Sequence, residues 1–364
     1  MSKPLEILVR GPNWTGDLIM ATPGFRALRS GFSEAGLTLH LRQELLPLVS
    51  GAPWFDEVLP LESYGKGIAA LLREGRALRP RRFDLGICLP DSFSSALLMR
   101  WAGVRHIVGY RRNGRSALLH HRVALPRKRG RRIMIAREKH VLGLIEAVGC
   151  PPRGTDLELH VTEAEDAEAR CKLEDRGVRE GGTIAVLAPG ASYGPSKTWP
   201  PTSFARVGDA LAAVGASVVL VGTPAERKLS GQVLSAMKEP AVDLTGELGL
   251  GALKGVVRRS RVLICNDAGA RHIAVAFGIP CVVVMGPTSL EKTNLNLERV
   301  KVLSADVDCR PCYLRECPID HRCMTRVSAE HVVQAALPAL SSDAKERWRG
   351  EVVQVRSDLP GVAA

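Results

Sequence analysis

Residues 262–272 read Val-Leu-Ile-Cys-Asn-Asp-Ala-Gly-Ala-Arg-His, a strand that leads directly into a helix. The apolar run stops at Asn266 and Asp267, Gly269 follows, and a helical pattern containing His272 begins at once. A helix start presents unpaired N–H groups and the positive end of a macrodipole, and Gly269 lets a ligand approach closely. The stretch therefore predicts a diphosphate site. The alternative is an ordinary helix start, with Asp267 as N-cap and His272 in the core.

A second stretch of the same kind lies near the N-terminus. Residues 5–17, Leu-Glu-Ile-Leu-Val-Arg-Gly-Pro-Asn-Trp-Thr-Gly-Asp, run from an apolar strand into a glycine-containing loop. An amphipathic helix is predicted to follow over residues 18–29. Because the two loops lie in separate halves of the chain, they predict a ligand cleft between two domains.

Strands and helices alternate through both halves. In the first half the pattern predicts strands at 5–9, 37–41, 58–61 and 84–89, and helices beginning at residues 18, 43, 66 and 92. After a segment rich in Pro and Gly at 150–156, further strands are predicted at 183–187, 217–221, 241–244, 262–265 and 281–285. This alternation is typical of parallel sheets covered on both faces. We therefore expect an α/β protein with two doubly wound domains, residues 1–160 and 161–340, and a tail over 341–364.

Composition sets the class of protein. With 364 residues, 45% of them hydrophobic and 24% charged, the chain is long enough for two complete cores. No apolar segment approaches the roughly 18 residues that span a bilayer, and residues 1–5 carry no signal-type pattern. A soluble cytoplasmic protein is expected. Neither GxGxxG nor a Walker A sequence is present, which disfavours a nicotinamide enzyme or a P-loop ATPase.

The net charge of +12 calls for an explanation, and much of the basic excess lies between Arg100 and Arg137. Such clustering attracts anions, which include nucleic acid, anionic lipid head groups and phosphorylated saccharides. A solvated basic loop is the plain alternative. Nucleic acid is disfavoured because aromatic residues make up only 4% of the chain and do not interleave with the basic ones.

Taken together, the motifs resemble glycosyltransferase family nine, and within it the heptosyltransferase II subgroup. The resemblance extends to about Leu340 and rests on residues 9–17, 189–192 with 197–200, 266–269 with His272, and a late cysteine pattern. It implies a GT-B fold, in which two Rossmann-like domains face each other across a cleft. The N-terminal domain would hold the acceptor and the C-terminal domain the nucleotide sugar. A final helix at 328–340 would cross back between the domains.

The resemblance also implies a reaction. L-glycero-D-manno-heptose would move from ADP-heptose to the inner core of lipopolysaccharide on lipid A, with inversion and without a cofactor or catalytic metal. The protein would work at the cytoplasmic face of the inner membrane as a peripheral protein, without nucleic acid. Three alternatives stay open: a family member with another nucleotide sugar or acceptor, a sugar-nucleotide epimerase that does not transfer, and a basic binding protein.

Catalytic roles carried over from the family fit the chemistry of transfer. Asp17 matches the catalytic aspartate that removes a proton from the acceptor hydroxyl, and a helix start favours its ionised form. The alternative is a helix-capping carboxylate. Lys197 matches the lysine that reaches the diphosphate and the donor sugar, where negative charge develops on the leaving group.

Binding roles follow in the same way. Glu226 matches the acidic position that holds the ribose hydroxyls, and Asp267 is expected to contact the donor heptose. Where the family usually has Ser or Thr, Ala268 removes a hydroxyl donor, although its backbone N–H remains. The other expected donor-binding residues are Ser192, Ala268, Gly269 and His272. The expected acceptor-binding residues are Asn13, Trp14, Arg111, Arg112 and Arg115.

Four cysteines form the late pattern, Cys309-x2-Cys312-x4-Cys317-x5-Cys323. Four closely spaced thiols are a candidate structural zinc site, although the spacing is not the usual pair of CxxC knuckles. Free thiols that pack a loop are the alternative, since a reducing cytoplasm disfavours stable disulfides.

Overall fold

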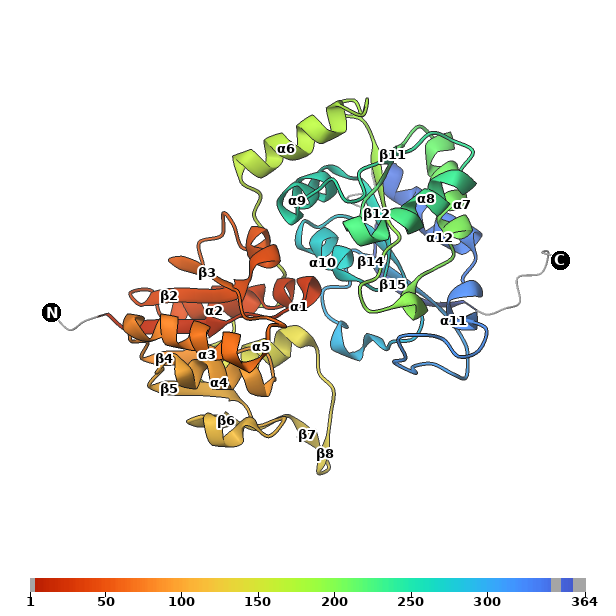
Figure 1. The fold of residues 1–364 in the computed structure, drawn as a ribbon. Coiled ribbons are helices and arrows are strands. Elements are labelled where there is room, and N and C mark those ends of the chain that lie inside the picture. The colour runs from red at the N-terminus through yellow and green to blue at the C-terminus, as the bar shows by residue number, and fades with distance from the viewer. Residues whose placement is uncertain (1–3, 342–347, 356–364) are drawn as a thin grey trace. The chain divides into compact units, whose positions relative to one another are not determined.

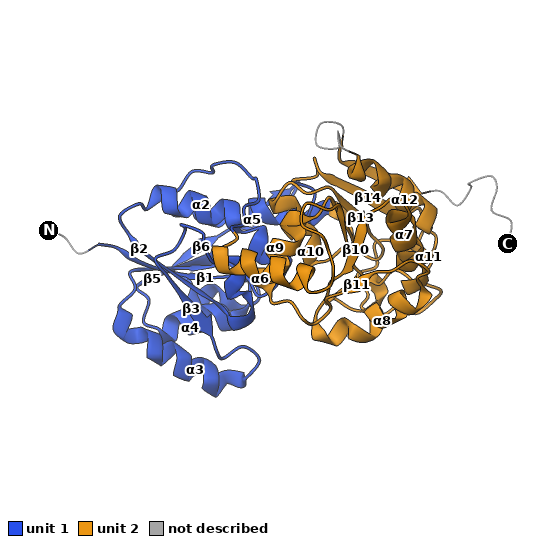
Figure 2. Ribbon diagram, turned by 90° about the horizontal axis from the view of Figure 1, so that it is seen from above, with its two compact units in different colours: residues 1–160, 291–295 blue, residues 161–290, 296–364 orange. Residues whose placement is uncertain are grey.

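The computed structural model describes residues 4–341 and 348–355. The chain divides into two compact units (Figure 2). Unit 1 comprises Met1–His160 with Glu291–Leu295, and unit 2 comprises Val161–Leu290 with Asn296–Ala364.

Unit 1 is built on a six-stranded parallel sheet of order β3-β2-β1-β4-β5-β6. Its strands are β1 (Glu6–Arg10), β2 (Gly36–Arg42), β3 (Glu57–Leu61), β4 (Leu85–Cys88), β5 (His106–Tyr110) and β6 (His121–Val123). Its helices are α1 (Thr15–Ile19), α2 (Thr22–Gly31), α3 (Gly67–Leu78), α4 (Phe93–Trp101) and α5 (Arg137–Glu146). Helices α2 and α5 cover one face and α3 and α4 the other (Figure 2). The doubly wound α/β prediction is confirmed for this unit.

Burial on both faces explains the sequence of the central strand. Ile7, Leu8 and Val9 are all fully buried in β1, as expected of a parallel strand between two helical layers. The helix predicted over 18–29 is instead two helices, because the chain turns after Ile19 and α2 starts afresh with Pro23 in its first turn. The helix predicted from Gln43 is a short 3-10 segment containing Pro47.

Unit 2 contains a seven-stranded parallel sheet of order β11-β10-β9-β12-β13-β14-β15. The strands are β9 (Ile184–Ala188), β10 (Ser217–Leu220), β11 (Val242–Asp243), β12 (Val262–Asn266), β13 (Cys281–Val284), β14 (Val300–Ala305) and β15 (Glu351–Val355). The helices are α6 (Glu163–Glu174), α7 (Pro201–Ala213), α8 (Arg227–Ala236), α9 (Leu250–Arg259), α10 (Gly269–Ala276), α11 (Arg322–Thr325) and α12 (Ala329–Ala336). This unit is also doubly wound (Figure 1).

Strand β15 was not expected, because residues 341–364 were predicted to be a tail. It pairs in parallel with β14, Lys301 opposite Glu351. Trp348 is buried just before it, with its ring 4.2 Å from the Lys301 ammonium. The strand lies at the sheet edge and leaves Val352 exposed, so its sequence lacks the continuous apolar run that identifies the inner strands.

Helix α12, the last α-helix among the described residues, packs within unit 2. Ser328 caps α12 through a hydrogen bond from the His331 backbone, and α12 lies against α7. Its buried residues, among them Val332 and Ala336, join the core around Trp199 and Phe204.

The helices are short. The longest in the described ranges, α7, has 13 residues, whereas a bilayer-spanning helix needs about 20. None of them is long and apolar enough to cross a membrane.

Candidate active site

Strand order fixes where each unit can bind a ligand. In unit 1 the order reverses between β1 and β4, and in unit 2 between β9 and β12. Doubly wound sheets bind ligands beyond the carboxyl ends of the strands at such reversal points. Asp17 and Asp91 follow β1 and β4, and Lys197 and Asp267 follow β9 and β12.

Lys197 and Asp267 meet at the reversal point of unit 2. The Lys197 ammonium lies 2.6 Å from Oδ2 of Asp267 and donates a second hydrogen bond of 3.0 Å to the Asp267 carbonyl oxygen. Both side chains are only 12% exposed. The structure therefore brings together two residues that are 70 positions apart in the sequence and that were predicted separately as donor-site residues.

Two further residues, neither of them predicted from sequence as a site residue, surround the Asp267 carboxylate. Thr288 donates a 2.8 Å hydrogen bond to Oδ2, and the buried Arg271 guanidinium lies 3.7 Å from Oδ1. Burial by itself raises the pKa of Asp267, but the charges of Lys197 and Arg271 outweigh it and hold the pKa below its ordinary value. The site thus holds an ionised carboxylate between two cations.

Asn266 holds the Lys197 loop in place. Its fully buried side chain donates a 2.6 Å hydrogen bond to the Pro189 carbonyl oxygen and accepts a 3.1 Å hydrogen bond from the Trp199 backbone N–H. Trp199 is itself buried and donates from its indole N–H to the Val327 carbonyl oxygen. Asn266 therefore has a structural role, and it fixes the backbone on both sides of Lys197.

Glu226 sits against two glycines at the carboxyl ends of β9 and β10. Its carboxylate accepts hydrogen bonds from the Thr223 N–H at 2.6 Å and the Thr223 hydroxyl at 2.9 Å. A Cβ on Gly190 would overlap this carboxylate, and one on Gly222 would lie 2.9 Å from it. Only glycine at position 190 allows this close approach.

The remaining predicted donor residues lie around the same edge. Helix α10 begins at Gly269, where the opening stretch predicts a helix start, and its N-cap is Ala268 rather than Asp267. The N-cap makes no side-chain hydrogen bond, so the first turn presents backbone N–H groups. His272 is buried in this helix, and Ser192 is exposed in the loop after β9.

In unit 1 Asp17 forms a two-pronged ion pair with Arg137. The Arg137 Nε and Nη2 atoms each lie 3.0 Å from one Asp17 oxygen. Burial disfavours the charged guanidinium, but Asp17 more than offsets this, so the pKa of Arg137 is raised. Asp17 belongs to the first turn of α1, and its side chain remains 25% exposed. Arg137 is a site residue that was not predicted from sequence, since it lies 120 positions from Asp17.

A second carboxylate, Asp91, organises the basic residues after β5. Arg112 lies 3.0 Å from Oδ2 of Asp91, Arg115 lies 3.3 Å from Oδ1, and the His140 ring lies 3.6 Å away. Burial raises the pKa of Asp91, but His140, Arg112 and Arg115 together lower it to about 2. Asp91 is therefore a structural anion that holds the loop containing Arg112 and Arg115 through ion pairs.

The prediction that Arg115 faces an acceptor is wrong. Its side chain is fully buried, and it donates to the Tyr110 carbonyl oxygen at 3.1 Å and to Ser95 Oγ at 3.2 Å. The sequence shows that Arg115 is charged but not that it is buried, because its counterion Asp91 lies on another loop. Arg111 is exposed, and Arg112 is partly exposed beside Asp91.

Replacing Asp91 by Ala is expected to destabilise unit 1 by about 3–5 kcal/mol, because it leaves the buried Arg115 charge without its counterion. In the unaltered protein the smaller contribution that comes from ionisation of Asp91 is present above about pH 4 and is lost progressively as the pH falls towards 2, since the folded-state pKa is depressed. Urea unfolding monitored by circular dichroism at pH 7 and at pH 3 measures both effects.

The matched control is Glu57→Ala, which removes the partner of the exposed Arg81. It should change stability by at most about 1 kcal/mol. If Asp91→Ala were no more destabilising than Glu57→Ala, the organising role of Asp91 would be refuted.

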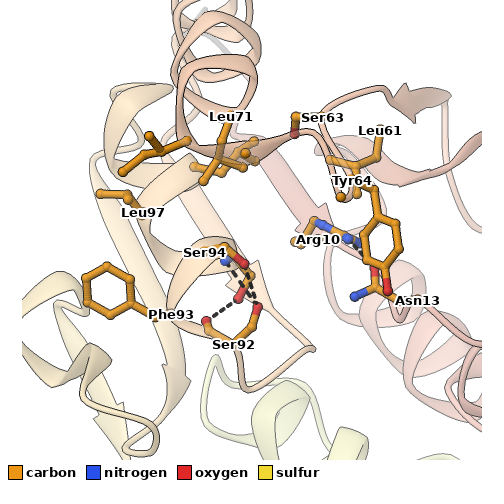
Figure 3. A pocket seen from close by; sticks show the side chains of 15 residues that line it. Arg10, Asn13, Leu61, Ser63, Tyr64, Leu71, Ser92, Phe93, Ser94 and Leu97 are labelled. Carbon is orange, nitrogen blue, oxygen red and sulfur yellow. Dashed lines mark hydrogen bonds between the residues drawn. The ribbon is translucent and has the colours of Figure 1, made fainter.

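A pocket of about 470 Å³ lies beside Arg10 and Asn13 at the carboxyl edge of the unit 1 sheet (Figure 3). Arg10 donates to the Asn13 side-chain oxygen. Across the pocket lie Ser92 and the partly exposed Phe93, and Tyr64 stands over Arg10 and Asn13. Leucines and Ile68 complete a wall that is mostly apolar. Asn13 was predicted to bind ligand, and Trp14 beside it is half exposed.

The cysteine pattern does not form a metal site in this arrangement. Cys323 is buried, and burial together with the nearby Cys309, Cys317 and Cys312 raises its pKa to about 11. Within residues 4–341 and 348–355, no three His, Cys, Asp or Glu side chains come together as metal ligands. The geometry therefore does not fit the tetrahedral zinc site that the spacing of the four cysteines suggested.

Comparison with known proteins places these features in a family. Residues 71–322 match the model of glycosyltransferase family 9 (heptosyltransferase). Lipopolysaccharide heptosyltransferase 2 of Salmonella typhimurium is 28% identical over 311 residues, which cover 82% of this chain and 88% of that protein.

Solved structures show the same fold. ADP-heptose lipopolysaccharide heptosyltransferase II of Escherichia coli aligns with a TM-score of 0.76 at 24% identity, covering 92% of this chain and 98% of that one. A family 9 glycosyltransferase from Veillonella parvula aligns with a TM-score of 0.80 at 21% identity, covering 93% and 98%. The expected GT-B class of two doubly wound units is confirmed. Because the family model covers more than half of its length, the chain belongs to glycosyltransferase family 9.

Proposed function

We propose that the protein is an inverting heptosyltransferase of the heptosyltransferase II type. It transfers L-glycero-D-manno-heptose from ADP-heptose to the inner core of lipopolysaccharide. The observation that carries this proposal is the Lys197–Asp267 pair at the reversal point of unit 2, beside the start of α10. The Salmonella typhimurium and Escherichia coli relatives, which are heptosyltransferases, supply the identity of the donor and the acceptor.

On the donor side, the leaving group is ADP, whose negative charge grows as the bond to the sugar breaks. Lys197 stabilises that charge, and the N–H groups of Ala268 and Gly269 with the Ser192 hydroxyl bind phosphate oxygens. Asp267 orients Lys197 and accepts from the sugar hydroxyls, while Glu226 holds the ribose. His272 supports the first turn of α10.

These hydrogen-bond donors and the Lys197 ammonium stabilise the leaving diphosphate without a metal ion. A divalent cation would neutralise the diphosphate, and here the Lys197 ammonium and the helix start supply positive charge for that purpose. The buried Arg271 adds a second cation beside Asp267.

On the acceptor side, Asp17 removes the proton from the attacking hydroxyl. The oxygen of that hydroxyl bonds to the anomeric carbon as ADP departs. Attack from the face opposite the leaving group inverts that carbon. Arg137 holds the carboxylate in place through one lone pair of each oxygen. A second lone pair on each oxygen can accept the hydroxyl proton.

We assign the pocket beside Arg10 and Asn13 to the acceptor saccharide. Sugar rings combine apolar C–H faces with a polar rim, and the pocket offers Tyr64 and Phe93 beside the Asn13 and Ser92 side chains. Trp14, Arg111 and Arg112 extend this acceptor-binding set. Because the acceptor is anchored through lipid A, the protein works as a peripheral protein at the cytoplasmic face of the inner membrane, without nucleic acid.

A donor screen by thermal shift tests the proposal. ADP-heptose should raise the melting temperature at concentrations where UDP-glucose and UDP-N-acetylglucosamine have no effect, since a ligand that binds only the folded state stabilises it. ADP alone serves as the control for the nucleotide half of the site. A larger shift with either UDP-sugar than with ADP-heptose would refute the assigned donor.

A further inference from the structure

A small hairpin of unit 1 stands outside both large sheets. Strands β7 (Arg127–Lys128) and β8 (Arg131–Arg132) pair only with each other, with Arg127 opposite Arg132 and Lys128 opposite Arg131. Arg129 and Gly130 form the turn with positive φ angles of 50° and 76°, as a two-residue hairpin turn requires. Figure 1 shows the hairpin beyond β6, on the segment that leads back to α5.

The charge of this hairpin is not balanced within the described structure. Arg127, Lys128, Arg129 and Arg131 are exposed, and none of the ion pairs among residues 4–341 and 348–355 includes them. No Asp or Glu occurs between Ser92 and Arg137. Like charges directly opposite each other destabilise a strand pair. An external anion bound across the two strands would relieve that repulsion.

Two apolar side chains follow the basic ones directly. Ile133 is 37% exposed and Met134 is 46% exposed. The Ile133 N–H donates a 3.2 Å hydrogen bond to the Pro126 carbonyl oxygen, which holds the two chain ends of the hairpin together. Binding to the surface of an anionic bilayer combines electrostatic attraction by basic residues with burial of exposed apolar side chains, and this segment has both.

We propose that residues 126–134, the basic hairpin, dock this protein onto an anionic phospholipid bilayer. The four exposed cations bind lipid phosphates, and Ile133 and Met134 enter the interfacial layer. This inference deepens the proposed function, which gives the enzyme a lipid-anchored acceptor. A bilayer fits better than nucleic acid, because the hairpin contains no aromatic residue for base stacking and exposes apolar side chains that nucleic acid would leave in water.

Vesicle co-sedimentation tests the proposal on the full chain without donor or acceptor. The unaltered protein should bind vesicles of phosphatidylglycerol mixed with phosphatidylcholine and should not bind phosphatidylcholine alone. The variant Lys128→Glu with Arg131→Glu should bind the anionic vesicles about 30-fold more weakly or worse, since each basic residue near the surface contributes about fivefold. Binding should weaken between about 0.05 M and about 0.5 M salt.

Two further variants make the result specific. Arg170→Glu with Lys238→Glu changes the net charge equally at exposed positions of unit 2 and should keep most of the binding. Ile133→Ser with Met134→Ser should lower the binding that persists at high salt, where charges are screened. Because the hairpin lies outside the large sheets, thermal melts of these variants should match that of the unaltered protein.

Equal loss of vesicle binding in the hairpin variant and the unit 2 variant would overturn the proposal, since binding would then follow net charge alone. Tighter binding to a DNA duplex than to the anionic vesicles, lost in the hairpin variant, would also overturn it. Transfer to a detergent-dispersed acceptor reports the proposed function separately. The hairpin variant should keep that activity, and a protein that binds vesicles but transfers no sugar would refute the function and leave the docking intact.

Discussion

Replacing Asp17 by Asn is expected to lower kcat by about 10²–10⁴-fold, the contribution of a positioned general base. The amide keeps the shape of the carboxylate and a hydrogen bond to Arg137, but it cannot take the proton of the acceptor hydroxyl. The KM for ADP-heptose should change little, because Asp17 belongs to unit 1 and the donor residues to unit 2. Steady-state release of ADP with saturating acceptor measures the effect.

The matched control is Asp56→Asn. Asp56 also pairs with an arginine, Arg29 at 2.7 Å, but it precedes β3 and so lies at the amino edge of the unit 1 sheet, away from Asp17. Its loss should leave kcat within about threefold, as for an exposed ion pair. A kcat for Asp17→Asn within tenfold of the unaltered value would mean that Asp17 serves only in its ion pair with Arg137, and the assigned base would be wrong.

Replacing Lys197 by Met is expected to lower kcat/KM for ADP-heptose by about 10²–10³-fold, which is typical for loss of one preorganised charge-stabilising donor. The variant keeps Arg271 and Thr288 on Asp267, so that carboxylate retains partners. Stopped-time assays of ADP release at low donor concentration give the ratio directly.

Lys254→Met is the appropriate control for Lys197→Met. Lys254 is a fully buried lysine of unit 2 that lies 3.0 Å from the Glu165 carboxylate, on α9 rather than at the reversal point. It should lower the melting temperature without a comparable loss of kcat/KM in the protein that remains folded. If both lysine variants lost activity in proportion to their stability, Lys197 would have a structural role and no catalytic one.

Much of the fold could be predicted from sequence because parallel strands buried on both faces leave continuous apolar runs. Residues 184–188 and 262–266 are entirely buried, and both were predicted within a residue or two. The mostly exposed strand 351–355, Glu-Val-Val-Gln-Val, lies at a sheet edge and has no continuous apolar run, so it resembles a polar tail. The break between α1 and α2 depends on Pro23, whose preference for a first helical turn was overlooked.

In the candidate site, too, features with a local sequence signal could be predicted and features that depend on distant contacts could not. The loops after β1, β9 and β12 could be predicted because a glycine-containing turn that follows an apolar run is a local signal. Arg137, Arg271 and Arg115 could not be assigned, because their roles depend on carboxylates that only the fold brings near them. The exposed wall of Tyr64, Ile68 and Phe93 was missed as well, since apolar residues of predicted helices and loops are normally assigned to the core.

The most direct test of the central claim is the release of ADP from ADP-heptose with and without a lipopolysaccharide acceptor that lacks its terminal inner-core heptose. We expect ADP release only when this acceptor is present, one ADP for each heptose transferred, and release that is about 10²–10⁴-fold slower with Asp17→Asn under the same conditions. Release at the same rate without acceptor, or transfer by Asp17→Asn at the unaltered rate, would contradict the account.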